Sequence, residues 1–333
     1  MSSTKSPEGE LLVGGQALIE GVMMRSPGAF GVAVRRPDGS LAFQRGKVAS
    51  LAKRYPFLKL PVLRGVAVLF QSLALGIRSL NFSAEQAMAE EPAAEAAEPK
   101  PEAKSSNLAI AGSMAFGLGA GVLIFLLLPL WLTHLVQTYV FGGDLSSLSF
   151  NLVDGALRAV FFLVYIFAIS RMKDIHRVFQ YHGAEHKVVF NYEKKLPLTV
   201  DNARAQSRLH PRCGTSFLLF VLLVSILVFA LIPKTAPFVV KFGGRLLLVP
   251  VIAGLSYEVL RFTAKHRAAP LFSLLVAPGL ALQRITTQEP TDDMLEVAIA
   301  ALEEALREDG LLGHPANPDE VPLLLPVAVD SRY

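Results

Sequence analysis

The stretch LAIAGSMAFGLGAGVLIFLLLPLWL, residues 108–132, decides the class of fold. It contains no charged residue and is long enough for a tilted α-helix to cross a hydrocarbon layer of about 30 Å. Gly117, Gly119 and Gly121 allow a neighbouring helix to approach closely, and Trp131 suits a membrane–water interface. The sequence therefore predicts an integral membrane protein.

The overall composition agrees with this assignment. Of the 333 residues, 52% are hydrophobic and 18% are charged, and the net charge is only +4. A modest positive charge that gathers in particular loops is typical of membrane topology, so no nucleic-acid partner is expected. Cys213 is the single cysteine, which excludes an intrachain disulfide.

Three further apolar runs, residues 152–170, 216–232 and 245–260, are predicted to cross the lipid bilayer. Two shorter runs, residues 65–77 and 270–282, are too short for an easy crossing and are predicted to be interfacial or re-entrant. The expected fold is mainly α: a polytopic helix bundle of about four spans with interfacial or re-entrant segments and a small N-terminal β-hairpin region.

The distribution of positive charge predicts the orientation. Loop 133–151 has no lysine or arginine, whereas loop 171–214 has nine. The positive-inside rule therefore places loop 171–214 in the cytoplasm of a multi-pass inner (plasma) membrane protein, with both termini on the same side.

Outside the spans the sequence predicts short, separate units. Residues 14–21 are predicted to form a tight strand and turn, and residues 32–48 a hairpin with its turn at PDGS. The predicted organisation is a cytoplasmic β-rich region (1–60), an interfacial or re-entrant helix (61–83), a disordered linker (84–106), a transmembrane domain (107–290), an amphipathic helix (291–310) and an unstructured tail (311–333).

The C-terminal helix is expected to begin after Thr291 and to end at Gly310. Its apolar stripe predicts docking either on a protein partner or on the chain's own bundle. Association into a homo-oligomer is a further hypothesis. The stripe consists of Leu295, Ile299, Leu302 and Leu306.

The motif YHGAEH, residues 181–186, predicts chemistry. It reads H-x-x-E-H, the inverted zinc-protease pattern. On a helix, His182 and His186 share a face and present two imidazoles to one divalent ion, zinc being the expected metal. Glu185 is then predicted to be the catalytic general base for a metal-activated water.

A catalytic zinc ion usually has three protein ligands, so a third is expected. Glu258, His210 and Cys213 are the candidates, and His210 is favoured because it arrives with Cys213 at the entrance of a predicted span. Neutral imidazole and thiolate both suit zinc. Cys213 could instead be a small buried residue, or a nucleophilic thiolate beside His210 in a different class of enzyme.

Several charged residues are candidates for substrate binding. Arg212 or Arg261 is expected to bind an anionic substrate group or a developing oxyanion. Glu20, with Gln16 and Arg25, is a weaker hypothesis for lining the same site, since its segment could simply form a turn.

Plain structural roles compete with these assignments. Glu185 could serve merely as an ion-pair partner of Lys187, Arg177 or a nearby histidine. Glu258 and Arg261 are three apart on a predicted helix and could be nothing more than an ion pair.

Four stretches together resemble the YqhQ family of bacterial multipass membrane proteins: GGQALIEGVMMRSP (14–27), RVFQYHGAEHK (177–187), HPRCGTSF (210–217) and QRITTQEP (283–290). The resemblance covers most of residues 12–306. It implies a multipass membrane protein of a family described as uncharacterised or as predicted metal-dependent enzymes. It supports a functional set without assigning roles within it: His182, Glu185, His186, His210 and Cys213.

Two functions follow as hypotheses. The first is a metal-dependent hydrolase at the cytoplasmic membrane surface, acting on a peptide or a lipid-linked substrate. The alternative is a non-catalytic membrane transport or assembly protein, in which the charged residues form a structural polar network.

Overall fold

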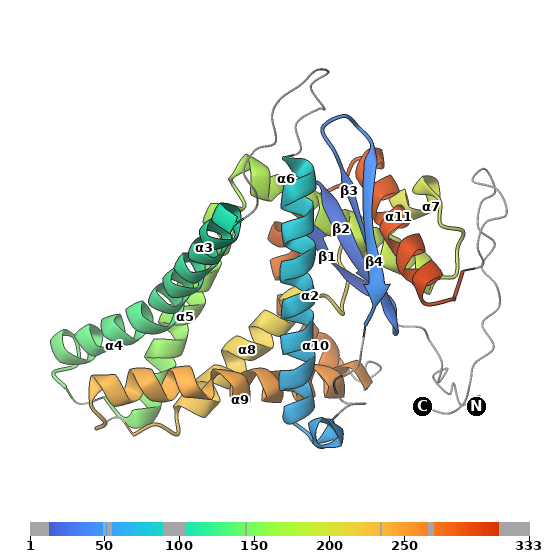
Figure 1. The fold of residues 1–333 in the computed structure, drawn as a ribbon. Helices are drawn as coiled ribbons and strands as arrows, with labels where there is room; N and C mark the ends of the chain where they lie inside the picture. Colours follow the sequence, from blue (N-terminus) through green and yellow to red (C-terminus); the bar gives the residue numbers. More distant parts are fainter. Residues whose placement is uncertain are drawn as a thin grey trace, which may run out of the picture.

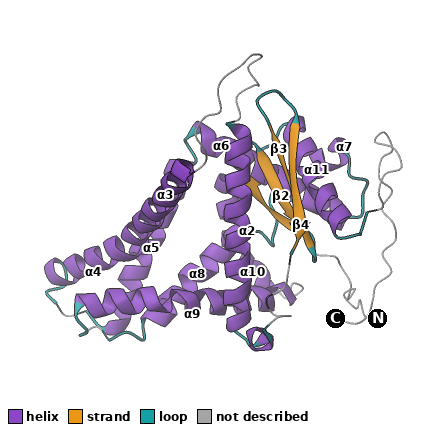
Figure 2. Cartoon of the chain, in the orientation of Figure 1, coloured by secondary structure: helices purple, strands orange, loops and turns teal. Residues whose placement is uncertain are grey.

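The computed structural model describes residues 13–48, 51, 55–88, 104–143, 145–233, 235–265 and 270–312. Helices form most of this part of the chain, and a single sheet is packed among them (Figure 2). Four of the described helical segments are long and apolar enough to cross a membrane: Leu63–Ala87, Ala115–Tyr139, Ser147–Ile169 and Phe238–Phe262. The protein is therefore a mainly α membrane protein, as the sequence predicts.

The sheet is an antiparallel meander in the order β1-β2-β3-β4. Gly39, at φ 85°, makes the turn between the last two strands, and Asp38 accepts a hydrogen bond from the Ser40 N–H at 2.8 Å. The predicted hairpin at 32–48 and the strand and turn at 14–21 are thus confirmed. The strands are β1 (Gly14–Leu18), β2 (Gly21–Arg25), β3 (Ala29–Arg35) and β4 (Leu41–Lys47).

Helices cover both faces of the sheet. Successive side chains of a strand point to opposite faces, so apolar residues occupy consecutive positions in β2 and β3. Helix α2 (Leu63–Ala87) lies along one face, while α6 (Lys173–Glu193) and α11 (Asp292–Glu308) lie on the other (Figure 1). The sheet is therefore the middle layer of a three-layer unit.

Helix α11 buries its predicted apolar stripe in this unit. Leu295, Leu302 and Leu306 are fully buried, and the helix is followed by Gly310 at φ 75°. Thr291 occupies the N-cap position but its side chain makes no capping hydrogen bond. Since the apolar face packs on the chain's own sheet and α6, any protein partner of this helix would meet its polar face.

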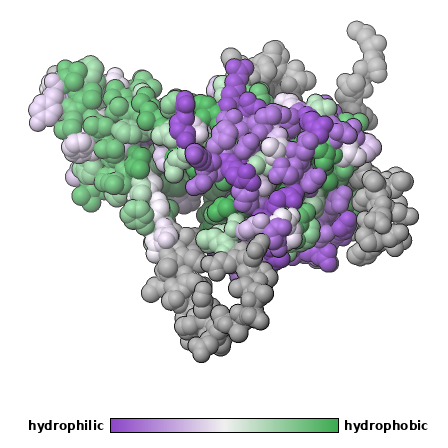
Figure 3. Space-filling view, turned by 90° about the horizontal axis from the view of Figure 1, so that it is seen from above, coloured by the Kyte–Doolittle hydropathy of each residue, from purple (hydrophilic) through white to green (hydrophobic). Residues whose placement is uncertain are grey.

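The remaining helices form the apolar half of the molecule, which Figure 3 shows as a hydrophobic region beside the hydrophilic sheet unit. The span Ala115–Tyr139 joins α3 (Lys104–Val122) and α4 (Leu128–Tyr139) through a π-helical turn, η2 (Leu123–Leu127), which precedes Pro129. The short helix α7 (Val200–Arg204) instead packs on α6 and α11 in the sheet unit. The other elements are η1 (Pro56–Lys59), α5 (Ser147–Ile169), α8 (Gly214–Phe229), α9 (Phe238–Lys265) and α10 (Pro270–Thr286).

Two predicted segments differ from the structure. The run 65–77, predicted to be short, belongs to the 25-residue helix α2, and Ser83 near its end accepts a hydrogen bond from Ile19 of the sheet unit. The run 216–232, predicted to be a full span, belongs to α8, whose 16 residues extend only about 24 Å. The number of candidate spans agrees with the prediction, but α2 takes the place of α8.

The predicted linker, 84–106, is helical at both ends: α2 continues to Ala87, and α3 begins at Lys104. The rest of that prediction, residues 89–103, lies outside the described residues, as do the tail from 313 onward and residues 1–12.

A buried ionic cluster joins α5 to α9. Asp154 accepts hydrogen bonds from Arg158 at 2.8 Å and from Arg245 at 2.6 Å, and all three side chains are buried. Charges inside a membrane bundle are costly unless they are paired in this way. Asp154 and Arg158 are four residues apart on α5, a spacing that lets their side chains pair on one face of the helix.

Candidate functional site

Helix α6 positions the motif histidines because its opposite face is anchored in the core. Tyr181, Ala184 and Val188 are fully buried against the sheet unit. This anchoring directs His182 and His186 to one flank, where their ring centroids are 4.4 Å apart. The predicted convergence of the two imidazoles is therefore present.

The third member of the cluster is Cys213, the N-cap residue of α8. Its sulfur lies 3.1 Å from Nε2 of His182, and the backbone N–H and hydroxyl of Thr215 donate to it. Cys213 therefore lies at the N-terminus of α8 with two donors directed at its sulfur. Ligand atoms of His182, His186 and Cys213 all lie within 4.8 Å of one another.

Backbone carbonyls determine which ring nitrogen faces the cluster. Nδ1 of His182 lies 2.8 Å from the Thr286 carbonyl oxygen, and Nδ1 of His186 lies 2.5 Å from that of Arg208. A carbonyl can only accept, so each Nδ1 carries a proton and each ring turns its Nε2 towards Cys213. Burial lowers the pKa of His186, which keeps its imidazole neutral.

One buried atom in the cluster has an unused lone pair. Nε2 of His186 is buried and forms no hydrogen bond of normal geometry with any described residue. It lies beside the Cys213 sulfur, in the cluster just described. Orphaned polar atoms are rare in protein interiors and need an explanation.

Glu185 lies next to the cluster, with one carboxyl oxygen 4.0 Å from Nε2 of His182. Burial raises the pKa of Glu185 above its ordinary value, while His182, His210 and a hydrogen bond from the Gly15 N–H act in the opposite direction. Gly15 lies on β1, so an edge strand of the sheet helps to hold the carboxyl group in place.

Two glycines permit the close packing that builds the site. A Cβ atom on Gly183 would lie 2.0 Å from the Gln288 carbonyl oxygen, and one on Gly15 would lie 2.9 Å from Cγ of Glu185. The first contact lets the segment after α10 approach α6, which brings the Thr286 carbonyl to His182. The second leaves room for Glu185 beside β1.

His210, the favoured third ligand, is a neighbour of the cluster and not a member. Its Nε2 faces Glu193 at 3.3 Å, its Nδ1 accepts from the Arg212 N–H at 3.2 Å, and its ring lies 5.7 Å from that of His186. Of the three candidates, the structure brings Cys213 to the two histidines. The turn before α8 directs the His210 ring to Glu193, which lies further along α6.

Glu258 is placed elsewhere. Both of its carboxyl oxygens accept hydrogen bonds from Arg64 of α2, and it also accepts one from the Val62 N–H. The structure therefore does not bring Glu258 to the two histidines, and its ion pair with Arg64 joins α2 to α9. Arg261, one turn further along α9, is exposed and adds to the positive charge near Glu258.

The remaining predicted substrate-binding residues are engaged in ion pairs. Arg212 pairs with Glu193, next to His210. Glu20 accepts two hydrogen bonds from Arg177 and one from the Tyr181 hydroxyl at 3.3 Å. Both pairs fasten α6 to its neighbours, so neither residue presents a free charge to the cluster.

Residues that support the cluster were not identified from the sequence. Gln283 is fully buried and clamps the His210 backbone with two hydrogen bonds of 2.8 Å, one to its carbonyl and one from its N–H. Thr286 and Arg208 contribute only carbonyl groups, which no side-chain pattern reveals. The sequence offers one indication of this role: Gln283 directly follows the apolar run 270–282 and begins the stretch 283–290.

The fold and the site define a class: a multipass membrane protein in which a sheet-anchored helix and a membrane-bundle helix share a His-His-Cys cluster. The chain belongs to a family described as "Protein of unknown function (DUF1385)", whose model matches residues 60–308. It is 40% identical over 305 residues to the "Uncharacterized protein YqhQ" of Bacillus subtilis (strain 168), covering 90% of this chain and 93% of that protein. No solved structure matches the chain.

Proposed function

We propose that the protein is a membrane-embedded, metal-dependent hydrolase. The observation that carries this proposal is the convergence of three nitrogen and sulfur atoms with a buried carboxyl group beside them. A cluster of two neutral imidazoles and one thiol is a donor set that binds zinc. Three ligands also leave a coordination position open, as catalytic zinc sites do.

The dimensions of the cluster support the proposal. Zinc–nitrogen and zinc–sulfur bonds of ordinary length place neighbouring ligand atoms of a tetrahedral ion roughly 3.5 Å apart. The separation of 3.1 Å between His182 and Cys213, and the limit of 4.8 Å for the whole cluster, need only small side-chain rotations to reach this value. The unused lone pair of His186 and the two carbonyl-oriented rings have the arrangement usual around metal-binding histidines.

A bound metal ion would supply Lewis acidity and would lower the pKa of a water molecule at the open position. The residues of the chain supply the remaining steps. Glu185 takes a proton from the attacking water and returns it to the leaving group. Its raised pKa suits this work, because a general base is most effective when its pKa is near the working pH.

We also infer that the site faces the cytoplasm of a plasma membrane. The support is the charge asymmetry of the two loops that flank α5: the nine basic residues of 171–214 against none in 133–151. The sheet, α6 and α11 form one packed unit, so they share a side of the membrane.

A non-catalytic transport or assembly role is the second candidate. It is favoured by the buried cluster of Asp154, Arg158 and Arg245, which holds two cations and one anion inside the bundle. Charged groups at that depth often belong to transport paths. This cluster has no contact with Glu185, so a Glu185→Gln variant that keeps full cellular function would favour this second candidate.

Metal analysis of the full-length protein in detergent tests the main proposal. Wild-type protein purified without chelator should contain about one zinc ion per chain, the number that a mononuclear site predicts. The His182→Ala/His186→Ala variant should contain almost none. His176→Ala is the matched control, because His176 lies on the same helix with an exposed side chain and should leave the metal content unchanged. Equal metal content in all three proteins would refute the proposal.

A further inference from the structure

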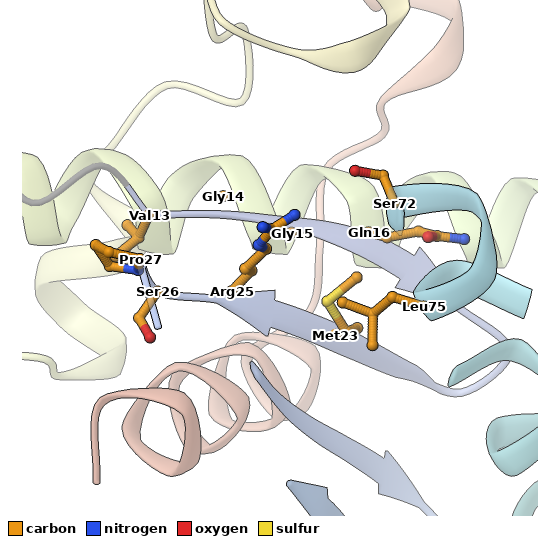
Figure 4. Close-up of a pocket in the computed structure, with 10 residues that line it drawn as sticks. All are labelled: Val13, Gly14, Gly15, Gln16, Met23, Arg25, Ser26, Pro27, Ser72 and Leu75. Atoms are coloured by element: carbon orange, nitrogen blue, oxygen red, sulfur yellow. The ribbon is translucent and has the colours of Figure 1, made fainter. Parts of the chain in front are cut away.

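A cavity of about 530 Å³ lies between α2 and the first two strands of the sheet. Gly15 and Gln16 of β1, Arg25 of β2 and Ser72 of α2 are among the residues that line it. In Figure 4 the Arg25 side chain extends from β2 towards Gly15, while Ser72 and Leu75 approach from α2. The cavity therefore combines polar groups with one cationic side chain.

Arg25 has no acidic partner among the described residues. It forms no hydrogen bond or ion pair with them, although it is partly buried and burial lowers its pKa. A guanidinium group nevertheless keeps its charge at neutral pH. Its partner across the strand pair is Gly14, which has no side chain and leaves space at that point. A partly buried, unpaired cation beside an open cavity favours binding of an anion.

A second cavity, of about 540 Å³, lies between α2, α5, α8 and α9. Its lining is apolar apart from Arg158 and Ser225, and includes Leu69, Phe217, Val221 and Ala253. Three of the four helices are candidate membrane spans, so hydrocarbon is the solvent at this level. The apolar part of the cavity suits the hydrocarbon chain of a lipid.

Neighbouring residues link the two cavities to each other and to the candidate metal site. Leu69 and Ser72 are one helical turn apart on α2, and each lines one cavity. On α8, Phe217 lies one turn beyond Cys213. Gly15 lines the first cavity and donates its N–H to Glu185. A molecule that occupied both cavities would pass close to the cluster.

We propose that the substrate is a membrane lipid with an anionic headgroup. Its hydrocarbon chain lies in the apolar cavity, and Arg25 binds its headgroup beside Gly15, the edge-strand residue that also contacts Glu185. The claim that this lipid is hydrolysed rests on the proposed hydrolase function. The binding of the lipid itself depends only on the two cavities.

Lipid binding to the full-length protein in detergent, measured by native mass spectrometry, tests the assignment. The probes are phosphatidylglycerol, neutral diacylglycerol with the same chains, and soluble glycerol phosphate. Phosphatidylglycerol should bind most tightly, because it alone satisfies both cavities. Arg25→Gln should weaken its binding about tenfold or more, as expected for loss of a charge-assisted contact, and should not affect diacylglycerol. Val221→Trp, which fills the apolar cavity, should weaken both lipids.

Controls separate this inference from the hydrolase proposal. Arg284→Gln removes an exposed arginine and should bind phosphatidylglycerol like the wild type. The His182→Ala/His186→Ala variant should lose metal and keep lipid binding, so a failure of the metal proposal leaves the lipid result intact. Arg25→Lys keeps the positive charge and should retain most of the affinity. This result would show that Arg25→Gln weakens binding through loss of charge and not through misfolding. Equal binding of phosphatidylglycerol to wild type and Arg25→Gln, or binding of glycerol phosphate as tight as that of the lipid, would overturn the inference.

Discussion

Replacement of Gly183 by alanine tests how the site is assembled. The added methyl group would lie 2.0 Å from the Gln288 carbonyl oxygen, whereas real contacts of this kind are no closer than about 3.0 Å. The segment that follows α10 must therefore move away from α6 by about 1 Å. Thr286, two residues before Gln288 at the end of α10, should move with it, and its carbonyl accepts the hydrogen bond that orients His182.

The size of the effect follows from two opposing terms. Alanine in a helix is favoured over glycine by about 0.5–1 kcal/mol, whereas overpacking at a rigid backbone contact costs about 1–3 kcal/mol. The expected net loss is roughly 0–2.5 kcal/mol of unfolding free energy. Misorientation of His182 should also weaken zinc binding about 10- to 100-fold, the usual effect of losing a group that orients a metal ligand. Thermal unfolding of metal-free protein and zinc competition with a chelating dye measure the two effects.

Gly243→Ala is the control, because Gly243 is also helical and a Cβ atom there would have no neighbour within 4 Å. This variant should be as stable as the wild type or slightly more stable, with unchanged zinc affinity. If Gly183→Ala behaves in the same way, the close packing of the Gln288 segment on α6 is not what positions His182, and the reasoning fails.

Two further predictions concern the acidic residues. Glu258→Gln should lower the thermal stability of the protein in detergent, because it weakens the pair with Arg64 that joins α2 to α9, and should leave the zinc content at the wild-type level; loss of zinc would restore Glu258 as a ligand. Burial raises the pKa of Glu185, so the metal-free folded protein retains a proton that the unfolded chain releases above about pH 4.3. The unfolding free energy should therefore fall as the pH rises through this window, and Glu185→Gln should remove that fall; parallel stability curves for the two proteins, measured by thermal melts from pH 4 to 8, would contradict the assignment.

The fold was predictable where one local property determines it. The charge-free stretch 108–132 identified a membrane helix, and the stripe on α11 identified a buried face. The length of α2 was not predictable, because polar residues after Ile77 resemble a helix end. In the structure Ser79 and Ser83 are fully buried beneath the sheet, so tertiary packing continues the helix where hydropathy alone would end it.

The site was predictable to the extent that it lies on a single helix. Spacing alone brought His182 and His186 together, because residues four apart share a face. The choice of Cys213 over Glu258 depends on how α8 and α9 dock against other elements. Glu258 forms an ion pair with Arg64, and this contact exists only because α2 packs on α9. Such long-range pairings leave no trace in one sequence.

The cluster occupies the seam between two parts of the molecule. His182 and His186 belong to a helix held by the sheet unit, whereas Cys213 begins a helix of the apolar bundle. A ligand bound by all three residues would therefore fix the two parts relative to each other. The same seam contains Glu185, and its neighbours Gly15 and Phe217 each line one of the two cavities. Reaction of an amphipathic substrate requires these features together, because its polar and apolar parts must both be bound while the bond between them is held next to the catalytic groups.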